Sequence, residues 1–170
     1  KMETQHHIKK YIEYHEQYTK KYGENTVVLM QAGSHFNLFA IINDEVNIGP
    51  DIYYICQTVL NNALQVTKQN KKKPEISYSN CLLAGFPVYS IGKYENILLN
   101  SNYTVVIVEQ ITAPPNPERG VTRILSPGTT VEDYNNRETR YLMSVYIEKN
   151  AYMNKDVFIT GLSTIDLSTG

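Results

Sequence analysis

The stretch AGFPVYSIGKYENIL, residues 84–98, decides the fold class, because a short strand passes into a helix within it. Residues 78–85 predict the strand, and residues 90–100 predict the helix. A fully apolar run, residues 103–108, follows and is typical of a strand buried on both faces. A strand, a helix and a second strand in this order predict an α/β fold.

The elements on either side of this stretch extend the same alternation. Residues 5–22 predict a helix, because their apolar side chains recur on one face. Two strands are expected at residues 26–32 and 35–42, followed by a second helix over residues 47–69. A further strand is expected at residues 120–125. The sequence therefore predicts a mixed β-sheet flanked by helices.

The character of the chain changes after about residue 128, which predicts a domain boundary. Residues 1–130 are assigned to the first domain, and the polar residues 131–140 to a linker. Residues 141–170 predict a hairpin pair of strands, which we interpret as the start of a second α/β domain that is cut short.

Composition and charge exclude several classes of function. The 170 residues carry a net charge of −1, so no stand-alone nucleic-acid binder is indicated, and any contact with DNA would take most of its affinity from elsewhere. The two cysteines, Cys56 and Cys81, are too few for a disulfide framework or a zinc site, and we expect small core residues. No segment has the apolar length of a membrane span, and the first residues lack a signal-peptide pattern. We therefore expect a reducing intracellular compartment, no secretion and no membrane partner.

The run GFPVYSIGK, residues 85–93, has a superficial likeness to a phosphate-binding loop. Six residues separate Gly85 from Gly92 where that loop requires four, and Tyr94 stands where a Ser or Thr must reach the metal. We therefore predict no nucleotide site here. Gly85 and Pro87 are expected instead to shape a turn into the helix.

No arrangement of reactive side chains nominates an enzyme. His6, His7 and His15 lack the Cys or acidic residues that would complete a tetrahedral metal set, and we interpret them as solvated helix residues. A nuclease would need clustered carboxylates, whereas residues 44–45 and 132–133 are interpreted as solvated loop acids. We expect neither a metal nor a cofactor bound to these residues.

Three segments carry a resemblance to a known family. They are AGFPVYSIGKYENIL at residues 84–98, NYTVVIVEQITAP at residues 102–114 and GVTRILSPGT at residues 120–129. In this order and spacing they resemble the N-terminal, mismatch-recognition domain of the MutS family of DNA mismatch-repair proteins. Each motif is weak alone, and the three together are specific. The resemblance runs from the first helix to the last strands, which look like the start of the family's connector domain.

The family pattern falls on defined positions of this chain. It consists of a small residue, Gly, an apolar residue and Pro, then a Tyr, a Glu-Gln pair and an Arg-containing strand. The matching residues are Ala84 to Pro87, Tyr94, Glu109-Gln110 and Arg123 to Thr129. One departure is Tyr89, where the family usually has His. These residues identify the fold better than the function.

The resemblance assigns a reading role to residues 33–39. In the family this stretch reads Gly-Asp-Phe-Tyr-Glu-Leu-Phe, and its Phe wedges into the DNA minor groove while its Glu hydrogen-bonds the mispaired base. Aligned without a gap, this chain has His35 at the Phe position and Asn37 at the Glu position. Phe36 could replace the wedge only if the strand slipped by one residue, which would turn its ring to the opposite face. We therefore predict His35 and Asn37 as the reading pair.

Two hypotheses for the function stay open. In the first, the chain is the DNA-binding module of a divergent MutS homologue that senses mismatched or branched double-stranded DNA. Lys71, Lys72 and Lys73 would then contact phosphates, although a solvated, mobile loop is the alternative for these lysines. In the second hypothesis, the fold supports the protein or binds a protein partner without reading mismatches.

The resemblance also implies features that belong to the rest of a MutS protein. Members of the family are dimeric clamps with a C-terminal ATPase, so ATP, magnesium and the dimer contacts are expected in parts absent from these residues. The 170 residues themselves are therefore expected to lack enzyme activity.

Overall fold

The computed structural model describes residues 2–113, 117–127, 141–152 and 155–166. The chain divides into two compact units, residues 1–127 and residues 128–170. The boundary predicted at residue 130 and the predicted linker, residues 131–140, lie outside the described residues. The domain assignment therefore stays a prediction.

A seven-stranded mixed sheet forms the centre of the first unit. Its strands are β1 (Thr26–Ala32), β2 (His35–Ile42), β3 (Asn47–Ile48), β4 (Thr67–Lys68), β5 (Leu82–Pro87), β6 (Thr104–Gln110) and β7 (Arg119–Leu125). The order across the sheet is β4-β5-β2-β1-β6-β7, and β3 pairs with the end of β2. β1 and β6 run parallel, and the other pairings of these strands are antiparallel. The predicted mixed sheet is confirmed.

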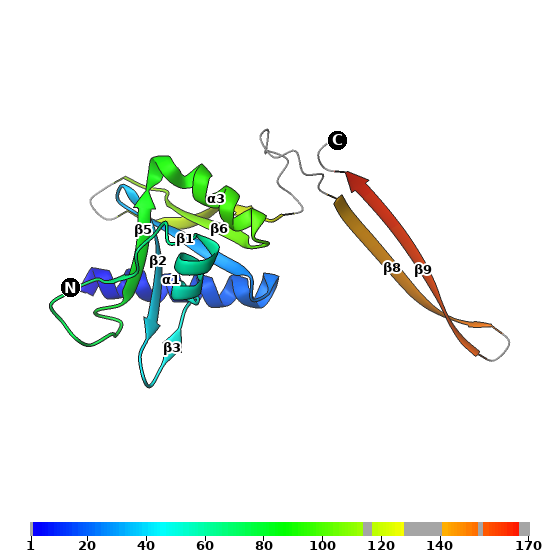
Figure 1. Ribbon diagram of the computed structural model, residues 1–170, viewed down its shortest axis with the longest axis horizontal. Coiled ribbons are helices and arrows are strands. Elements are labelled where there is room, and N and C mark those ends of the chain that lie inside the picture. The colour runs from blue at the N-terminus through cyan, green and yellow to red at the C-terminus, as the bar shows by residue number, and fades with distance from the viewer. Residues whose placement is uncertain (1, 114–116, 128–140, 153–154, 167–170) are drawn as a thin grey trace. The chain divides into compact units, whose positions relative to one another are not determined.

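Helices cover the two faces of this sheet (Figure 1). They are α1 (Met2–Tyr22), α2 (Ile52–Tyr54), the π-helical turn η1 (Ile55–Val59), the 3₁₀ turn η2 (Val88–Ser90) and α3 (Ile91–Asn100). α1 packs on one face, whereas α2, η1 and α3 pack on the other. In the described part of the chain, no helix is both long and apolar enough to cross a membrane.

The central strands are apolar at consecutive positions because both faces of the sheet are buried. Val27 and Leu29 pack in the cluster under α3, whereas Val28 and Met30 pack in the cluster under α1. None of these four side chains is more than 1% exposed. Burial of each such side chain stabilises the fold by roughly 1.5–3 kcal/mol, so β1 anchors both cores.

The second helix predicted over residues 47–69 is wrong in its extent. Helical structure covers only residues 52–59, and it begins where the Asp51 side chain accepts a hydrogen bond from the Tyr54 N–H at 3.0 Å. Asn61 and Asn62 have φ angles of 47° and 58°, a left-handed conformation that Asn tolerates and that ends a helix. The two ends of the predicted helix form strands instead: β3 pairs with β2, and β4 pairs with β5.

Two predictions around residue 85 also need correction. The strand predicted at residues 78–85 is β5, residues 82–87, because Ser77 and Asn80 close a tight turn before it. Gly85 lies inside this strand, so the predicted turn role is wrong for Gly85. Pro87 does lead the chain into helical structure, with extended φ and ψ angles of −62° and 146° before η2.

The second unit contains a long antiparallel hairpin. β8 (Tyr141–Tyr152) pairs along its whole length with β9 (Lys155–Asp166). The predicted pair of strands is confirmed. Apolar side chains are exposed along both strands, with Val145 53% and Leu162 66% exposed.

Candidate nucleic-acid interface

The turn between β1 and β2 forms an exposed tip, which we call the hairpin tip, residues 32–35. Ala32 pairs with His35, so only Gly33 and Ser34 connect the two strands. Gly33 has a φ angle of +61°, a conformation that glycine adopts without steric cost at the first position of a tight hairpin turn. The predicted break at these two residues is confirmed, and all four residues of the tip are exposed.

Side chains alternate across β2 in the register expected from the ungapped alignment. Phe36 is only 2% exposed and lies in the core under α3, where its ring centroid is 6.1 Å from that of Phe86. His35 is exposed and Asn37 is half-buried, and both point to the opposite face of the strand. The Phe36 ring could therefore reach a ligand only if this core opened.

The two predicted reading residues are linked to each other and to the tip. The Ser34 hydroxyl and His35 Nδ1 are 3.1 Å apart, and the Asn37 amide donates a long hydrogen bond of 3.5 Å to the His35 carbonyl. Both side chains therefore keep polar atoms near the surface. The reading role of His35 and Asn37 itself stays a prediction.

A network around Gln31 braces the hairpin tip from inside the sheet. The Gln31 amide donates to the Gly33 carbonyl at 3.1 Å, and its side-chain oxygen accepts the Gln110 N–H at 3.0 Å. Arg119, which is only 8% exposed, donates from Nε to the Gln31 carbonyl at 2.8 Å. Burial lowers the pKa of Arg119. One glutamine side chain thus ties the turn to β6, while its backbone ties β1 to β7.

Helix α1 contributes to the same network. His7 Nε2 lies 2.8 Å from Arg119 Nη1, and both Lys10 and Tyr14 donate to the Arg119 carbonyl, at 3.2 and 3.3 Å. The interpretation of all three α1 histidines as solvated is therefore wrong for His7, because its ring nitrogen meets a guanidinium. His15 is also half-buried, and burial lowers its pKa.

The three predicted phosphate-contacting lysines lie in a loop that we call the basic loop, residues 69–80. Lys71, Lys72 and Lys73 are all exposed. The loop backbone is anchored by Asn80, which is 1% exposed and bonds the Asn70 N–H at 2.7 Å and the Glu75 carbonyl at 2.6 Å. The loop therefore has a defined backbone that presents its lysines to solvent. Its contact with phosphate stays a prediction.

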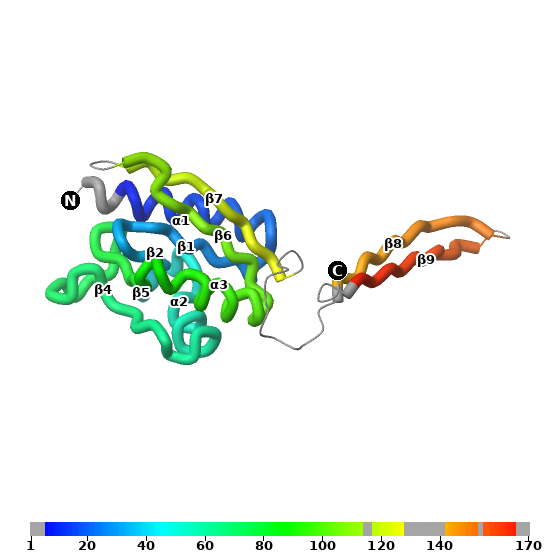
Figure 2. The backbone as a smooth tube through the Cα atoms, turned by 90° about the horizontal axis from the view of Figure 1, so that it is seen from above, coloured from blue at the N-terminus to red at the C-terminus, as the bar shows by residue number. Residues whose placement is uncertain are grey.

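The basic loop and the hairpin tip lie at opposite ends of the β2–β5 pair. His35 pairs with Pro87, whereas the loop leaves β4 after Lys68, which pairs with Leu82. β4, β5 and β2 are neighbours in the sheet (Figure 2). Five residues of strand separate these positions, or about 17 Å at roughly 3.4 Å per residue. The predicted site residues are thus not one cluster, and only an extended ligand would contact both groups.

Tyr89 lies in η2, next to the hairpin tip, and was not among the predicted site residues. Its side chain is 86% exposed, and it follows Val88, whose N–H donates to the Ser34 carbonyl at 3.0 Å. A signal was present in the sequence, because Tyr89 is a departure from the family pattern. Its proximity to His35 depends on the pairing of β5 with β2, which sequence spacing does not reveal.

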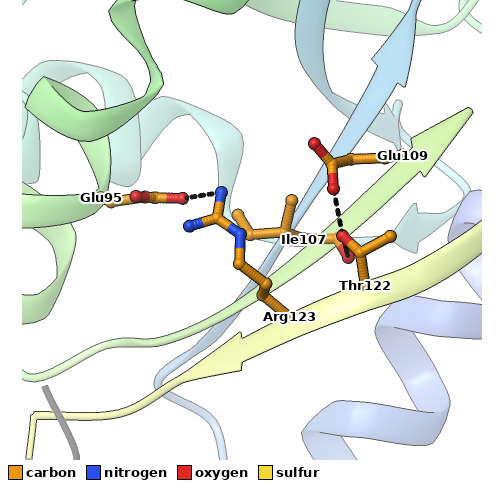
Figure 3. Close-up of polar contacts among 5 residues, drawn as sticks. All are labelled: Glu95, Ile107, Glu109, Thr122 and Arg123. Carbon is orange, nitrogen blue, oxygen red and sulfur yellow. Dashed lines mark hydrogen bonds and ion pairs between the residues drawn. The ribbon is translucent and has the colours of Figure 1, made fainter.

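The residues that carry the family pattern mostly hold the fold together. Glu95 of α3 is 8% exposed and accepts a hydrogen bond from Arg123 of β7 at 2.7 Å, above Ile107 of β6 (Figure 3). Glu109 of β6 accepts a hydrogen bond from the Thr122 hydroxyl of β7. These contacts join α3, β6 and β7, which agrees with the expectation that the motifs identify the fold.

Other candidate sites for chemistry are weaker. Among the described residues, no group of three or more His, Cys, Asp or Glu side chains could hold a metal ion. Cys56 and Cys81 are buried in the core, as predicted, and burial raises the pKa of Cys56 to about 11 and that of Cys81 to about 12. A cavity of about 130 Å³ beside His15 and Tyr103 is lined also by Thr26, the first residue of β1, at the end of that strand away from the tip.

Comparison with known proteins agrees with this architecture. A family model described as MutS domain I matches residues 7–134. A DNA mismatch repair protein mutS homologue of Acanthamoeba polyphaga mimivirus is 32% identical over 159 residues, covering 91% of this chain and 14% of that protein. The DNA mismatch repair protein MutS of Methanothrix thermoacetophila is 32% identical over 116 residues, covering 65% of this chain and 12% of that protein. MutS of Trichodesmium erythraeum is 28% identical over 176 residues, covering 96% of this chain and 16% of that protein.

These findings define the class of protein to which the chain belongs. Its first unit is a mixed-sheet domain of the kind called MutS domain I, with a braced hairpin tip at one end of the sheet. The chain belongs to the MutS family, which confirms the resemblance seen in its motifs. It spans only 12 to 16% of the length of the three relatives named here.

Proposed function

We propose that the first unit senses mismatched or structurally altered duplex DNA, with His35 and Asn37 in the places of the family's Phe and Glu. The observation that carries this proposal is the hairpin tip, which is exposed, projects from the end of a two-sided core and is braced by Gln31 and Arg119. The relatives' names, which refer to DNA mismatch repair, support it. The unit itself acts as a binding module and not as an enzyme.

The chemistry of His35 and Asn37 favours weaker contacts with a base than those of the family's Phe and Glu. An imidazole stacks on a base with less area than a phenyl ring, so His35 wedges into an intact duplex less strongly than Phe would. The Asn37 amide offers one acceptor and two donor hydrogens without a charge. Such a pair discriminates best where the bases are already unpaired, because the cost of unstacking is then lowest.

The basic loop would add affinity that does not depend on sequence. Each lysine that neutralises a phosphate releases counterions, which makes binding weaker as salt rises. The basic loop begins about 17 Å from His35 along β5, so its lysines would meet the DNA backbone while His35 meets a base. These contacts would position the duplex and not read it. In the full-length protein, ATP, magnesium and dimer contacts would belong to other domains.

A competition assay with the full-length protein tests this proposal. Affinity is measured for a G·T-mismatched duplex, a perfect duplex and a branched junction, for the wild type and for His35→Ala/Asn37→Ala. We expect the wild type to prefer the mismatch or the junction, and the double substitution to lose at least about fivefold of that preference, because a stacked base contributes about 1–3 kcal/mol. A triple Lys71→Gln/Lys72→Gln/Lys73→Gln variant should bind all three DNAs more weakly, with a shallower salt dependence.

Two other results would point elsewhere. A preference for the junction that survives His35→Ala/Asn37→Ala would move recognition away from this pair. The proposal would be wrong if the wild type bound all three DNAs with equal affinity, even at low salt. That result would favour the alternative, in which the domain has a structural or protein-binding role.

A further inference from the structure

Tyr89 is the most exposed large hydrophobic side chain described in the first unit. It is 86% exposed, whereas Ile111, Tyr54 and Tyr53 are 56%, 51% and 40% exposed. Within the described residues, the Tyr89 ring packs on no other ring and its hydroxyl makes no hydrogen bond. A single exposed aromatic residue is ordinary on a protein surface. Its position is what gives this one significance.

The backbone places Tyr89 beside the hairpin tip. Pro87 pairs with His35 in the sheet, and the Val88 N–H donates to the Ser34 carbonyl at 3.0 Å. This hydrogen bond joins the residue before Tyr89 to the residue before His35. An exposed tyrosine in η2, the turn directly after β5, and an exposed histidine at the start of β2 thus lie at the same end of the sheet.

The segment that carries Tyr89 is held firmly. Phe86 stacks on Tyr94 of α3 with ring centroids 4.0 Å apart, and Phe86 is only 2% exposed. Pro87 fixes its own φ angle, and η2 runs directly into α3. An aromatic side chain on such a fixed backbone has few torsions to order on binding, so a contact made by its ring loses little conformational entropy.

We propose that Tyr89 is a specificity-determining residue that stacks on an unpaired or unstacked base at the hairpin tip. This inference rests on the proposed function, because it takes DNA as the ligand of the hairpin tip. The ring would supply the stacking area that the imidazole of His35 lacks. The phenol hydroxyl, which can donate and accept, stays available to a base edge or a phosphate. The aromatic contact with DNA would then come partly from β2 and partly from the turn after β5.

The test uses the full-length protein and two DNA ligands. One is a duplex with a single unpaired 2-aminopurine, and the other is the fully paired duplex that lacks this extra base. Stacking of an aromatic ring on 2-aminopurine quenches its fluorescence, so this probe reports the contact itself and not only the affinity. The variants are Tyr89→Ala, Tyr89→Phe and, as a matched exposed tyrosine, Tyr54→Ala on α2. Thermal unfolding checks that each variant folds.

We expect Tyr89→Ala to weaken binding to the unpaired-base duplex about 10-fold and to remove the quenching, with little change for the matched duplex. The slope of affinity against salt should stay the same, because no charge is lost. Tyr89→Phe should retain the quenching and bind within about twofold of wild type, since stacking needs the ring and not the hydroxyl. Tyr54→Ala should behave as wild type.

Different failures separate this inference from the proposed function. If Tyr89→Ala binds and quenches as wild type while His35→Ala/Asn37→Ala loses discrimination, the inference about Tyr89 is overturned and the proposed function stands. If Tyr54→Ala lowers affinity as much as Tyr89→Ala, the effect is not specific to the tip and the inference also fails. If the wild type does not distinguish the two duplexes, both are overturned.

Discussion

Gly85 and Asn37 stand directly opposite each other on β5 and β2, and their contact shows why a glycine occupies the centre of a strand. A Cβ atom added at Gly85 would lie 2.2 Å from Asn37 Oδ1 and 2.9 Å from the Phe36 carbonyl oxygen. Glycine is normally unfavourable inside a strand, because it loses more backbone entropy and packs no side chain. The absent Cβ here makes room for the Asn37 side chain at the candidate interface.

We expect Gly85→Ala to lower the free energy of unfolding by about 1–3 kcal/mol, the usual cost of forcing extra atoms into a packed site. The Asn37 side chain can rotate away, but the Phe36 carbonyl belongs to the backbone of β2 and cannot move without disturbing the sheet. Urea unfolding of the chain, followed by circular dichroism, measures the change.

Gly92 provides a matched control for this substitution. It lies in α3, and a Cβ there would meet no atom within 4 Å. Gly92→Ala should therefore be neutral or stabilise the fold by up to about 1 kcal/mol, because alanine favours a helix. Equal losses of stability for the two variants would show that the contact with Asn37 and Phe36 is not the cause.

Some features of the candidate interface were within reach of sequence reasoning, and others were not. Alternation along a strand sufficed to predict that Phe36 points away from His35 and Asn37, because it depends only on neighbours in sequence. Tyr89 lies 54 positions after His35. It reaches the tip only through the register of β5 on β2, and a single sequence does not specify which strands pair.

Helix α3 is fastened to the sheet by an ion pair between elements. Glu95 has a side chain only 11% exposed, whereas that of Arg123 is 44% exposed. Removal of Arg123 would leave a largely buried carboxylate without its cation, which costs more than the loss of an ordinary surface pair. The pair therefore helps to set the position of α3, and with it η2 and Tyr89.

We expect Arg123→Gln to destabilise the first unit by roughly 1–2 kcal/mol, since one partner of the hydrogen bond is charged and buried while the other is partly solvated. A double-mutant cycle with Glu95→Gln measures the coupling between the two side chains in urea unfolding. Lys93→Gln, an exposed change on the same helix, is the control and should alter stability by less than about 0.5 kcal/mol. Additive effects of Arg123→Gln and Glu95→Gln would contradict an energetic role for the pair.

The elements with a strong apolar period were predicted closely, and the exception has a local cause. α1, β1, β2, α3, β6 and β7 lie within a few residues of the expected ranges. The helix expected over residues 47–69 failed because its apolar spacing continues past residue 59, while Asn61 and Asn62 take left-handed angles. Asparagine occurs inside helices as well as at their ends, so only the packed structure reveals where the chain turns away.

At the scale of the whole molecule, the two units differ in how they bury apolar side chains. The first unit has a core on each face of its sheet. The β8–β9 hairpin exposes apolar side chains on both faces, because Val145 and Tyr146 are neighbours on one strand and are 53% and 61% exposed. Strands that are apolar on both faces are typical of a sheet covered by helices on both sides. This pattern favours the prediction of a second α/β domain, which stays a prediction.

We expect residues 1–127 to fold on their own and residues 128–170 to lack a cooperative unfolding transition. The first unit buries both of its hydrophobic cores with its own helices. An isolated two-stranded hairpin, by contrast, is at best marginally stable in water. Thermal unfolding of the 1–127 fragment should match that of the 170-residue chain within about 4 °C, which corresponds to less than about 1 kcal/mol for a domain of this size. The longer chain should also associate more at high concentration, because its hairpin exposes Leu162 and Phe158, each 66% exposed. A fragment that melts more than about 10 °C lower than the chain would mean that the hairpin stabilises the first unit, and the division into two independent units would be wrong.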